Sequence, residues 1–108
     1  DRNFLVTGSP GGSRIITTTL QVIMNVIDHN MNIQTAVSAP RIHHQWLPDE
    51  IRVEQGISPD TLDLLRARGH TINTGSAMGA IQSILIGEDG TLYGGADPRR
   101  STSSAMGF

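Results

Sequence analysis

The sequence predicts an α/β (α+β) fold in which helices cover at least one face of a sheet. Three observations support this prediction. Short apolar stretches with strand character alternate with helical patterns. A long helical period follows the first glycine-rich turn, and a hairpin signal lies near the C-terminus. The predicted order is strand, helix, short helix, strand, helix, strand and hairpin.

The N-terminal third contains the first strand and the longest helix. Residues 4–7 predict a short buried strand, and residues 8–12 predict a turn that contains Pro10. From Ser13 onward apolar residues occupy both faces of a helical pattern. They are Ile16, Leu20, Ile23 and Ile27 on one face, and Ile15, Val22 and Val26 on the other. A helix that is apolar nearly all round is typical of a buried position, and Asn30 is its expected C-terminal cap.

The middle of the chain predicts a short helix, a connection and a strand. Residues 33–39 form the helix, and Pro40 stops it because the residue before a proline disfavours the helical conformation. Residues 41–48, "RIHHQWLP", predict a polar and aromatic connection. Ile51 and Val53 alternate with charged residues, which indicates a half-buried strand.

The clearest helix of the sequence begins at Ser58. This serine is a good N-cap, Pro59 suits the first helical position, and Asp60 suits the positive end of the helix dipole. The helix ends before Gly69. Its apolar stripe consists of Leu62, Leu64 and Leu65.

The C-terminal part predicts a strand, a hairpin and a tail. Residues 70–73 form the strand, and residues 80–98 form a hairpin that turns at Asp89-Gly90. Residues 81–86 are apolar on both faces, which predicts a central strand covered on both sides. Residues 101–108 show no periodicity, and we expect them to be a mobile tail.

Composition excludes several classes of protein. The 108 residues predict one small domain, 1–108. The formal charge is −2, and the eight basic residues are scattered arginines apart from the pair Arg99-Arg100, so we predict no nucleic-acid partner. The absence of cysteine excludes disulfides, and no apolar run reaches the about 20 residues of a membrane span. Because the chain opens almost directly on a strand, we expect it to be a piece of a longer protein.

The glycine pair Gly11-Gly12 lies where the first strand ends and the long helix begins. A helix N-terminus offers free backbone N–H groups with a partial positive charge, and glycines let an anion approach them closely. The pair therefore suits a phosphate, the oxyanion of an acyl-transfer intermediate, or a plain turn with no chemistry. The lysine of a phosphate-binding loop is missing, whereas an oxyanion hole needs only two converging N–H donors.

The histidines and serines favour structural roles. His43 and His44 are adjacent, so on a strand they point to opposite faces. No spacing typical of metal ligands is present, and we predict neither a metal nor a cofactor. Ser9 and Ser13 flank the glycines but lack the G-x-S-x-G pattern of a hydrolase nucleophile.

Two arginines, Arg14 and Arg41, lie beside structured turns outside any basic patch. An arginine in such a place usually pairs with a carboxylate, and Asp28 and Asp97 are the candidate partners. We interpret both arginines, together with Pro10, as structural residues near the glycine turn.

Five stretches, taken in order, resemble the C-terminal part of the small subunit of bacterial γ-glutamyltranspeptidases. They are LVTGSPGGSRI, APRIHHQWLPDEIRVEQG, SPDTLDLL, AMGAIQSI and LYGGADPR. The resemblance runs from about residue 4 to residue 100 and so covers nearly the whole chain. The final residues, STSSAMGF, are less similar to the family's usual ending.

The resemblance implies a fold, an activity and a site. Family members are N-terminal nucleophile hydrolases, and the chain is then a fragment of their αββα sandwich. Their proenzyme cleaves itself, and the new N-terminal threonine attacks the γ-glutamyl amide of glutathione or related compounds. The γ-glutamyl group then passes to water, an amino acid or a peptide. The glycines of the family's PGGS turn donate N–H groups to the oxyanion hole, which implies this role for Gly11 and Gly12. Bacterial members are mostly periplasmic or secreted, and we expect the same localisation.

The resemblance also implies what the chain lacks. The family's nucleophile lies upstream of the matched region, and neither Thr7 nor Thr17–Thr19 aligns with it. We therefore expect the chain alone to be inactive, with the rest of the small subunit, the large subunit and small-molecule γ-glutamyl substrates as its partners. We expect strands 4–7 and 81–86 to present open edges and an uncovered apolar face, which favours self-association.

Other functions stay open on the sequence alone. One is a non-catalytic structural or interaction module with the same fold. A second is a related N-terminal nucleophile acylase that acts on other amides. A third, an anion- or nucleotide-binding domain, rests only on the glycine turn. A threonine nucleophile motif upstream of this segment would distinguish the enzyme from the non-catalytic module.

Overall fold

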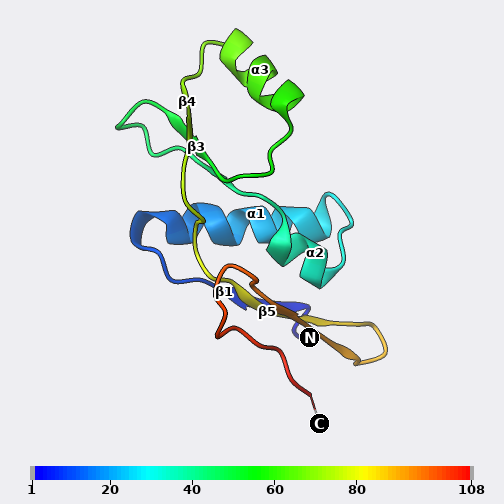
Figure 1. Cartoon of the computed structure of the whole chain (residues 1–108). Helices are drawn as coiled ribbons and strands as arrows, with labels where there is room; N and C mark the ends of the chain where they lie inside the picture. Colours follow the sequence, from blue (N-terminus) through cyan, green and yellow to red (C-terminus); the bar gives the residue numbers. More distant parts are fainter. Residues whose placement is uncertain (1, 108) are drawn as a thin grey trace.

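A three-stranded antiparallel sheet forms one layer of the molecule, as the computed structural model shows for residues 2–107 (Figure 1). β1 (Leu5–Gly8) and β6 (Leu92–Ala96) pair with opposite sides of β5 (Gln82–Ile86). The β5–β6 hairpin turns at Gly90, whose φ of 85° favours glycine. The predicted hairpin and its turn are therefore confirmed.

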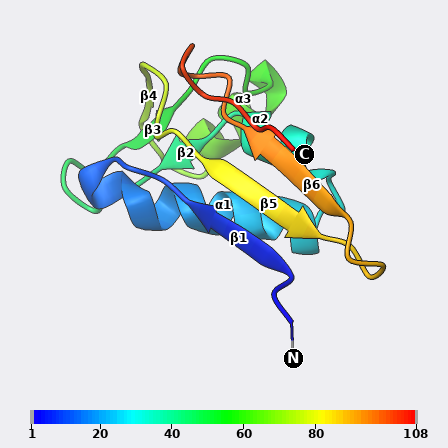
Figure 2. The ribbon, with the colours of Figure 1, turned by 90° about the horizontal axis from the view of Figure 1, so that it is seen from below.

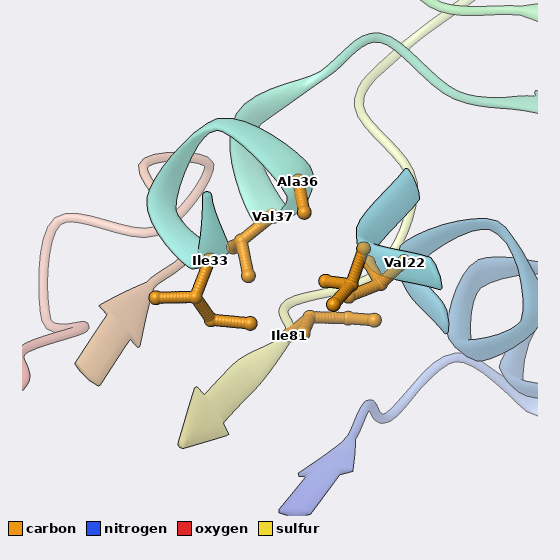
Figure 3. Close-up of a cluster of buried hydrophobic side chains, with 6 residues drawn as sticks. Val22, Ile33, Ala36, Val37 and Ile81 are labelled. Atoms are coloured by element: carbon orange, nitrogen blue, oxygen red, sulfur yellow. The ribbon is translucent and has the colours of Figure 1, made fainter. Parts of the chain in front are cut away.

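Two helices cover one face of this sheet, and Figure 2 shows them behind its strands. They are α1 (Ile15–Ile27) and α2 (Ile33–Ser38). Between them Asn30 adopts the left-handed conformation, with φ 53°, where the chain reverses. The hydrophobic core lies between the helices and the sheet (Figure 3). Its buried members are Val22, Val26, Ile33, Ala36, Val37 and Ile81.

The prediction that the first helix is buried on all sides is wrong. α1 buries Thr18, Val22 and Val26 on its inward face. On the opposite face Ile16 is 79% exposed and Leu20 is 52% exposed. The helix is apolar nearly all round, but only one of its sides packs on the sheet, and Ile16 and Leu20 stay exposed on the other.

The predicted burial of two strands, β1 and β5, is also wrong in part. β1 is not buried, because it lies at an edge of the sheet, where Phe4 and Val6 are both more than half exposed. β5 is the central strand, as its apolar faces predicted, so the expected open edge there is wrong. It is covered on one face only, since Ile84 is 43% exposed. The expected uncovered apolar face is therefore present on the described part of the chain.

A second small sheet lies on the other side of α1 from the first (Figure 1). β2 (Ile42–His43) pairs antiparallel with β3 (Ile51–Val53), and β3 pairs parallel with β4 (Ile72–Thr74). Parallel neighbours require a crossover connection, and α3 (Pro59–Ala67) lies within it.

The predicted strands and helix of this region are confirmed, with two differences. The connection 41–48 contributes the two-residue strand β2, because Ile42 pairs with Val53. The leucine stripe of α3 is not buried, and Leu64 is 67% exposed. In Figure 1 this helix lies apart from α1 and α2, and its other two leucines, Leu62 and Leu65, are only half-buried.

The segment after β6 returns along the first sheet. The Ser103 hydroxyl accepts a hydrogen bond from Gln82 Nε2 at 2.7 Å. Residues 104–107 and the uncovered sheet face line a pocket of about 540 Å³. Phe108, the end of the predicted tail, lies outside the described residues. None of the described helices has the length and apolar character needed to cross a membrane.

Candidate functional site

The glycine turn at the start of α1 has a backbone that only glycine adopts easily. Gly11 has φ 139° and Gly12 has φ 59°. Their carbonyl groups accept hydrogen bonds from Arg14 N–H and Ile15 N–H, which begins a 3₁₀ turn over Gly12–Arg14. Their own N–H groups have no acceptor within residues 2–107, and both glycines are exposed. Two unpaired donors therefore lie at a helix N-terminus, where a negative charge is favoured.

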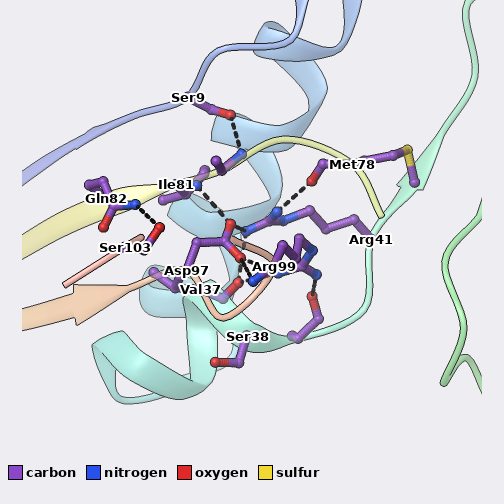
Figure 4. Close-up of polar contacts among 12 residues, drawn as sticks. Ser9, Val37, Ser38, Arg41, Met78, Ile81, Gln82, Asp97, Arg99 and Ser103 are labelled. Carbon is purple, nitrogen blue, oxygen red and sulfur yellow. Dashed lines mark hydrogen bonds and ion pairs between the residues drawn. The ribbon is translucent and has the colours of Figure 1, made fainter. Parts of the chain in front are cut away.

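Ser9 connects this turn to the segment that precedes β5. Its hydroxyl donates to Pro10 O at 2.7 Å. It accepts from Ala80 N–H at 3.0 Å (Figure 4). Next to Ala80, Gly79 has φ 74°. A Cβ at residue 79 would stand 2.7 Å from Ser9 Oγ and 2.8 Å from Thr18 Cγ2, too close for any larger residue without a shift.

A buried ion cluster lies behind that segment. Arg41 is 2% exposed and donates from Nη2 to Asp97 Oδ2 at 2.9 Å (Figure 4). The same guanidinium donates to the carbonyl groups of Met78 and Val37, at 2.6 and 2.7 Å. Asp97 is one of the two partners that the sequence predicts for this arginine. The contact uses one guanidinium nitrogen, so it is not bidentate.

Arg99 and Glu54 complete the cluster. Arg99 donates to both oxygens of Glu54, and Nη1 donates to Asp97 Oδ1 at 3.1 Å. Glu54 also accepts backbone N–H bonds from Arg41 at 2.8 Å and from Met78 at 2.6 Å. Two guanidinium groups and two carboxylates thus neutralise one another away from water, which buried charges require.

The cluster shifts the pKa of each member for identifiable reasons. Burial alone would raise the pKa values of Glu54 and Asp97, but the hydrogen bonds from backbone N–H groups and arginines lower both below their ordinary values. Burial and the neighbouring charge of Arg99 lower the pKa of Arg41. The pKa of Arg99 is raised, because its bonds to the two carboxylates outweigh its burial.

Arg14 lies apart from this cluster. No ion pair joins it to a carboxylate within residues 2–107. It lines a small pocket of about 140 Å³. The other residues of that pocket are His43, Gln45, Pro48, Glu50 and Arg52.

The histidine pair behaves as two separate residues. His43 is buried and its Nε2 lies 3.0 Å from Gln45 Oε1, whereas His44 contacts the exposed Asp49 at 3.2 Å. Across the described chain, no three side chains among histidine, cysteine, aspartate and glutamate come together as a metal site would require.

Sequence reasoning found the glycine turn but missed what supports it. The sequence patterns assign no role to Glu54 or Arg99, and they offer Ser9 only as a candidate nucleophile. The only local signal was the Asp97-Pro98-Arg99 sequence directly after a strand, which places two opposite charges at the end of the sheet.

Comparison with known proteins decides the family. Residues 1–107 match the sequence profile described as gamma-glutamyltranspeptidase. The chain belongs to the gamma-glutamyltranspeptidase family. It is 57% identical to the glutathione hydrolase proenzyme of Escherichia coli K12 over 107 residues, which are 99% of this chain and 18% of that protein. It therefore spans less than a fifth of the length of this relative.

Solved structures agree with the assignment. The gamma-glutamyltranspeptidase T380A mutant of Helicobacter pylori superposes with a TM-score of 0.85 and 56% identity, over 90% of this chain and 54% of that one. The cephalosporin acylase of Bacillus halodurans gives a TM-score of 0.83 and 30% identity, over 94% of this chain and 20% of that one. The expected fold class, a mixed α/β fragment of an N-terminal nucleophile hydrolase, is confirmed.

Proposed function

We propose that this chain works as part of a longer γ-glutamyltranspeptidase that cleaves γ-glutamyl amides such as glutathione. The γ-glutamyl group passes to a threonine nucleophile and then to water, an amino acid or a peptide. The Gly11-Gly12 turn supports the proposal most directly, because its two unpaired N–H donors lie at a helix N-terminus. The chain also belongs to the family whose members perform this reaction.

The two glycines stabilise the oxyanion of the tetrahedral intermediate. Attack on the amide carbon moves an electron pair onto the carbonyl oxygen, and backbone N–H donors already in place lower the energy of that charge. The left-handed φ of Gly12 and the φ of 139° at Gly11 explain why larger residues are unsuited to this turn. Pro10 and Arg14 flank the turn and restrict its path.

The nucleophile comes from outside this chain. Neither Thr7 nor Thr17–Thr19 serves that role, since Thr7 bonds Ser83 within the sheet and the other three lie inside α1. The rest of the small subunit and the large subunit complete the site, and the assembled enzyme is periplasmic or secreted. No cofactor or metal takes part in this proposal.

An acylase acting on other amides is the second candidate. The structural similarity to a cephalosporin acylase supports this second candidate. The residues that select the acyl group are not identified within this chain, so they do not distinguish the two candidates. Hydrolysis of a panel of γ-glutamyl and non-γ-glutamyl amides distinguishes the two.

The experiment uses the full-length protein that contains this segment and measures hydrolysis of γ-glutamyl-p-nitroanilide. Gly12→Pro removes one N–H donor, and we expect kcat to fall by about 10²–10³-fold. Gly12→Ala keeps the donor and meets no atom within 4 Å, so it reports the effect of backbone strain alone. Gly90→Pro is the matched control, since Gly90 has φ 85° in the distant hairpin turn.

Each outcome has a distinct meaning. A large loss in Gly12→Pro alone supports the oxyanion role. Equal losses in Gly12→Pro and Gly90→Pro mean that the proline acts through folding, and an unaffected Gly12→Pro removes the role from this glycine. A folded full-length protein that hydrolyses no amide supports a non-catalytic module.

A further inference from the structure

The glycine turn is held from behind by one side chain. Ser9 bonds Ala80 N–H with its oxygen and Pro10 O with its proton. Pro10 directly precedes the glycine pair, so this hydroxyl is a two-bond bridge between the turn and residues 78–81. No other side-chain hydrogen bond within residues 2–107 joins these two segments.

Residues 78–81 are in turn fixed by the buried ion cluster. Met78 N–H donates to Glu54 at 2.6 Å, and Met78 O accepts from Arg41 at 2.6 Å. Ile81 N–H donates to Asp97 at 2.7 Å. Both ends of the segment are thus bonded to charged side chains that are themselves paired, which gives a rigid support.

At Gly79, residues 78–81 contact both Ser9, next to the glycine turn, and Thr18 of α1. Ser9 Oγ and Thr18 Cγ2 both lie within 3 Å of the place where a Cβ would stand. Thr18 is fully buried in α1. The strand end, the helix and the supporting segment therefore meet at residue 79, and any displacement there moves the glycine turn.

We propose that Ser9 is a positioning residue for the oxyanion hole. Its two hydrogen bonds hold Gly11 and Gly12 in a fixed position relative to residues 78–81. This inference rests on the proposed function. Oxyanion donors act over a narrow range of distance, about 2.7–3.1 Å, and a misplacement of about 1 Å can reduce a rate about 10²-fold. Ser9 touches neither substrate nor nucleophile in this proposal. It acts through the turn.

The test uses the full-length enzyme and two pairs of variants. Ser9→Ala removes the bridge, and Ser101→Ala is its control because Ser101 is exposed and makes no side-chain hydrogen bond within the described chain. Gly79→Ala displaces Ser9 by collision. Gly90→Ala is its control, with a similar positive φ but no atom within 4 Å.

The readouts are kcat and KM for γ-glutamyl-p-nitroanilide, with active sites titrated by a covalent inhibitor, and the Tm of each variant. We expect kcat per active site to fall about tenfold in Ser9→Ala, by analogy with small misplacements of catalytic groups, with KM changed less than about twofold. Gly79→Ala should lose at least as much, and both controls should keep the wild-type kcat.

Three results would overturn the proposal. A wild-type kcat per active site in Ser9→Ala removes the positioning role, and so does a loss confined to Tm or to the fraction of active enzyme, which marks a purely structural residue. A rise in KM at constant kcat assigns Ser9 to substrate binding instead. Activity that survives Gly12→Pro removes the oxyanion role from Gly12, and a wild type without activity refutes the proposed function; both results are seen before Ser9 is altered.

Discussion

Arg99 and Glu54 are 45 positions apart in the sequence, yet the guanidinium of one donates to both carboxylate oxygens of the other. The pair is almost fully buried, with side-chain exposures of 9% and 6%. It joins the end of the first sheet, through Arg99, to the end of β3, through Glu54. Much of what holds the two sheets of this chain together therefore depends on charge.

Arg99→Ala should strongly destabilise the protein. Removing one partner leaves the Glu54 carboxylate buried and unpaired, and such a change costs about 3–5 kcal/mol. Denaturant unfolding of the full-length enzyme followed by a probe in this segment measures the effect. Arg66→Ala is the control, because its pair with Asp63 is exposed and contributes less than about 1 kcal/mol. Similar losses in the two variants would contradict the role given to burial.

Acid should destabilise this segment through Glu54 and Asp97. Both have folded-state pKa values below the ordinary range. Their contribution is then fully present above about pH 4.5, and it is lost as the pH falls through about 4 toward the lower folded-state pKa values. Unfolding midpoints between pH 3 and 7 measure this, and Asp97→Asn should flatten the acid limb. An acid limb identical to that of the wild type would show that other groups cause it.

The chain expressed alone should not hydrolyse γ-glutamyl-p-nitroanilide. The proposed donors, Gly11 and Gly12, stabilise an intermediate but supply no nucleophile. The assay compares the purified chain with buffer and with the full-length enzyme at equal molar concentration. Turnover above buffer that persists through further purification would mean that a residue within this chain attacks the amide.

The chain alone should also self-associate. The outer side of α1 and the outer face of β1 and β5 expose large apolar side chains, and such surfaces promote association. Sedimentation over a range of concentrations should reveal dimers or larger species. The double variant Ile16→Glu/Leu20→Glu should shift the distribution toward monomer, whereas Ser101→Glu, at an exposed polar position, should not. A wild-type chain that stays monomeric at high concentration would refute this prediction.

Sequence patterns predicted most of the elements because their signals are local. Pro40 ends α2, Ser58 and Pro59 precede and begin α3, and Gly90 turns the hairpin. Each acts through the conformation of a few neighbouring residues. The family resemblance added the proposed oxyanion role of the glycine turn and the fold of the relatives, which no local pattern contains.

Burial and the ion cluster were harder to predict. The pattern of α1 says which residues are apolar but not which segments are present to cover them, so Ile16 and Leu20 were wrongly placed in a core. The link between Arg99 and Glu54 depends on how two sheets are arranged in space. A charged residue after a strand looks the same in sequence whether it faces water or a buried partner.

The missing side chain at Gly79 makes three positions share one small volume. Ser9 and Thr18 already occupy the space beside residue 79, since a Cβ at 79 would stand 2.7 and 2.8 Å from their atoms. Enlarging one of them therefore requires shrinking another. Gly79→Ala should be better tolerated together with Ser9→Ala than alone, because that pair removes the collision with the hydroxyl; the contact with Thr18 Cγ2 and the positive φ still oppose it, and the hydroxyl bridge stays lost.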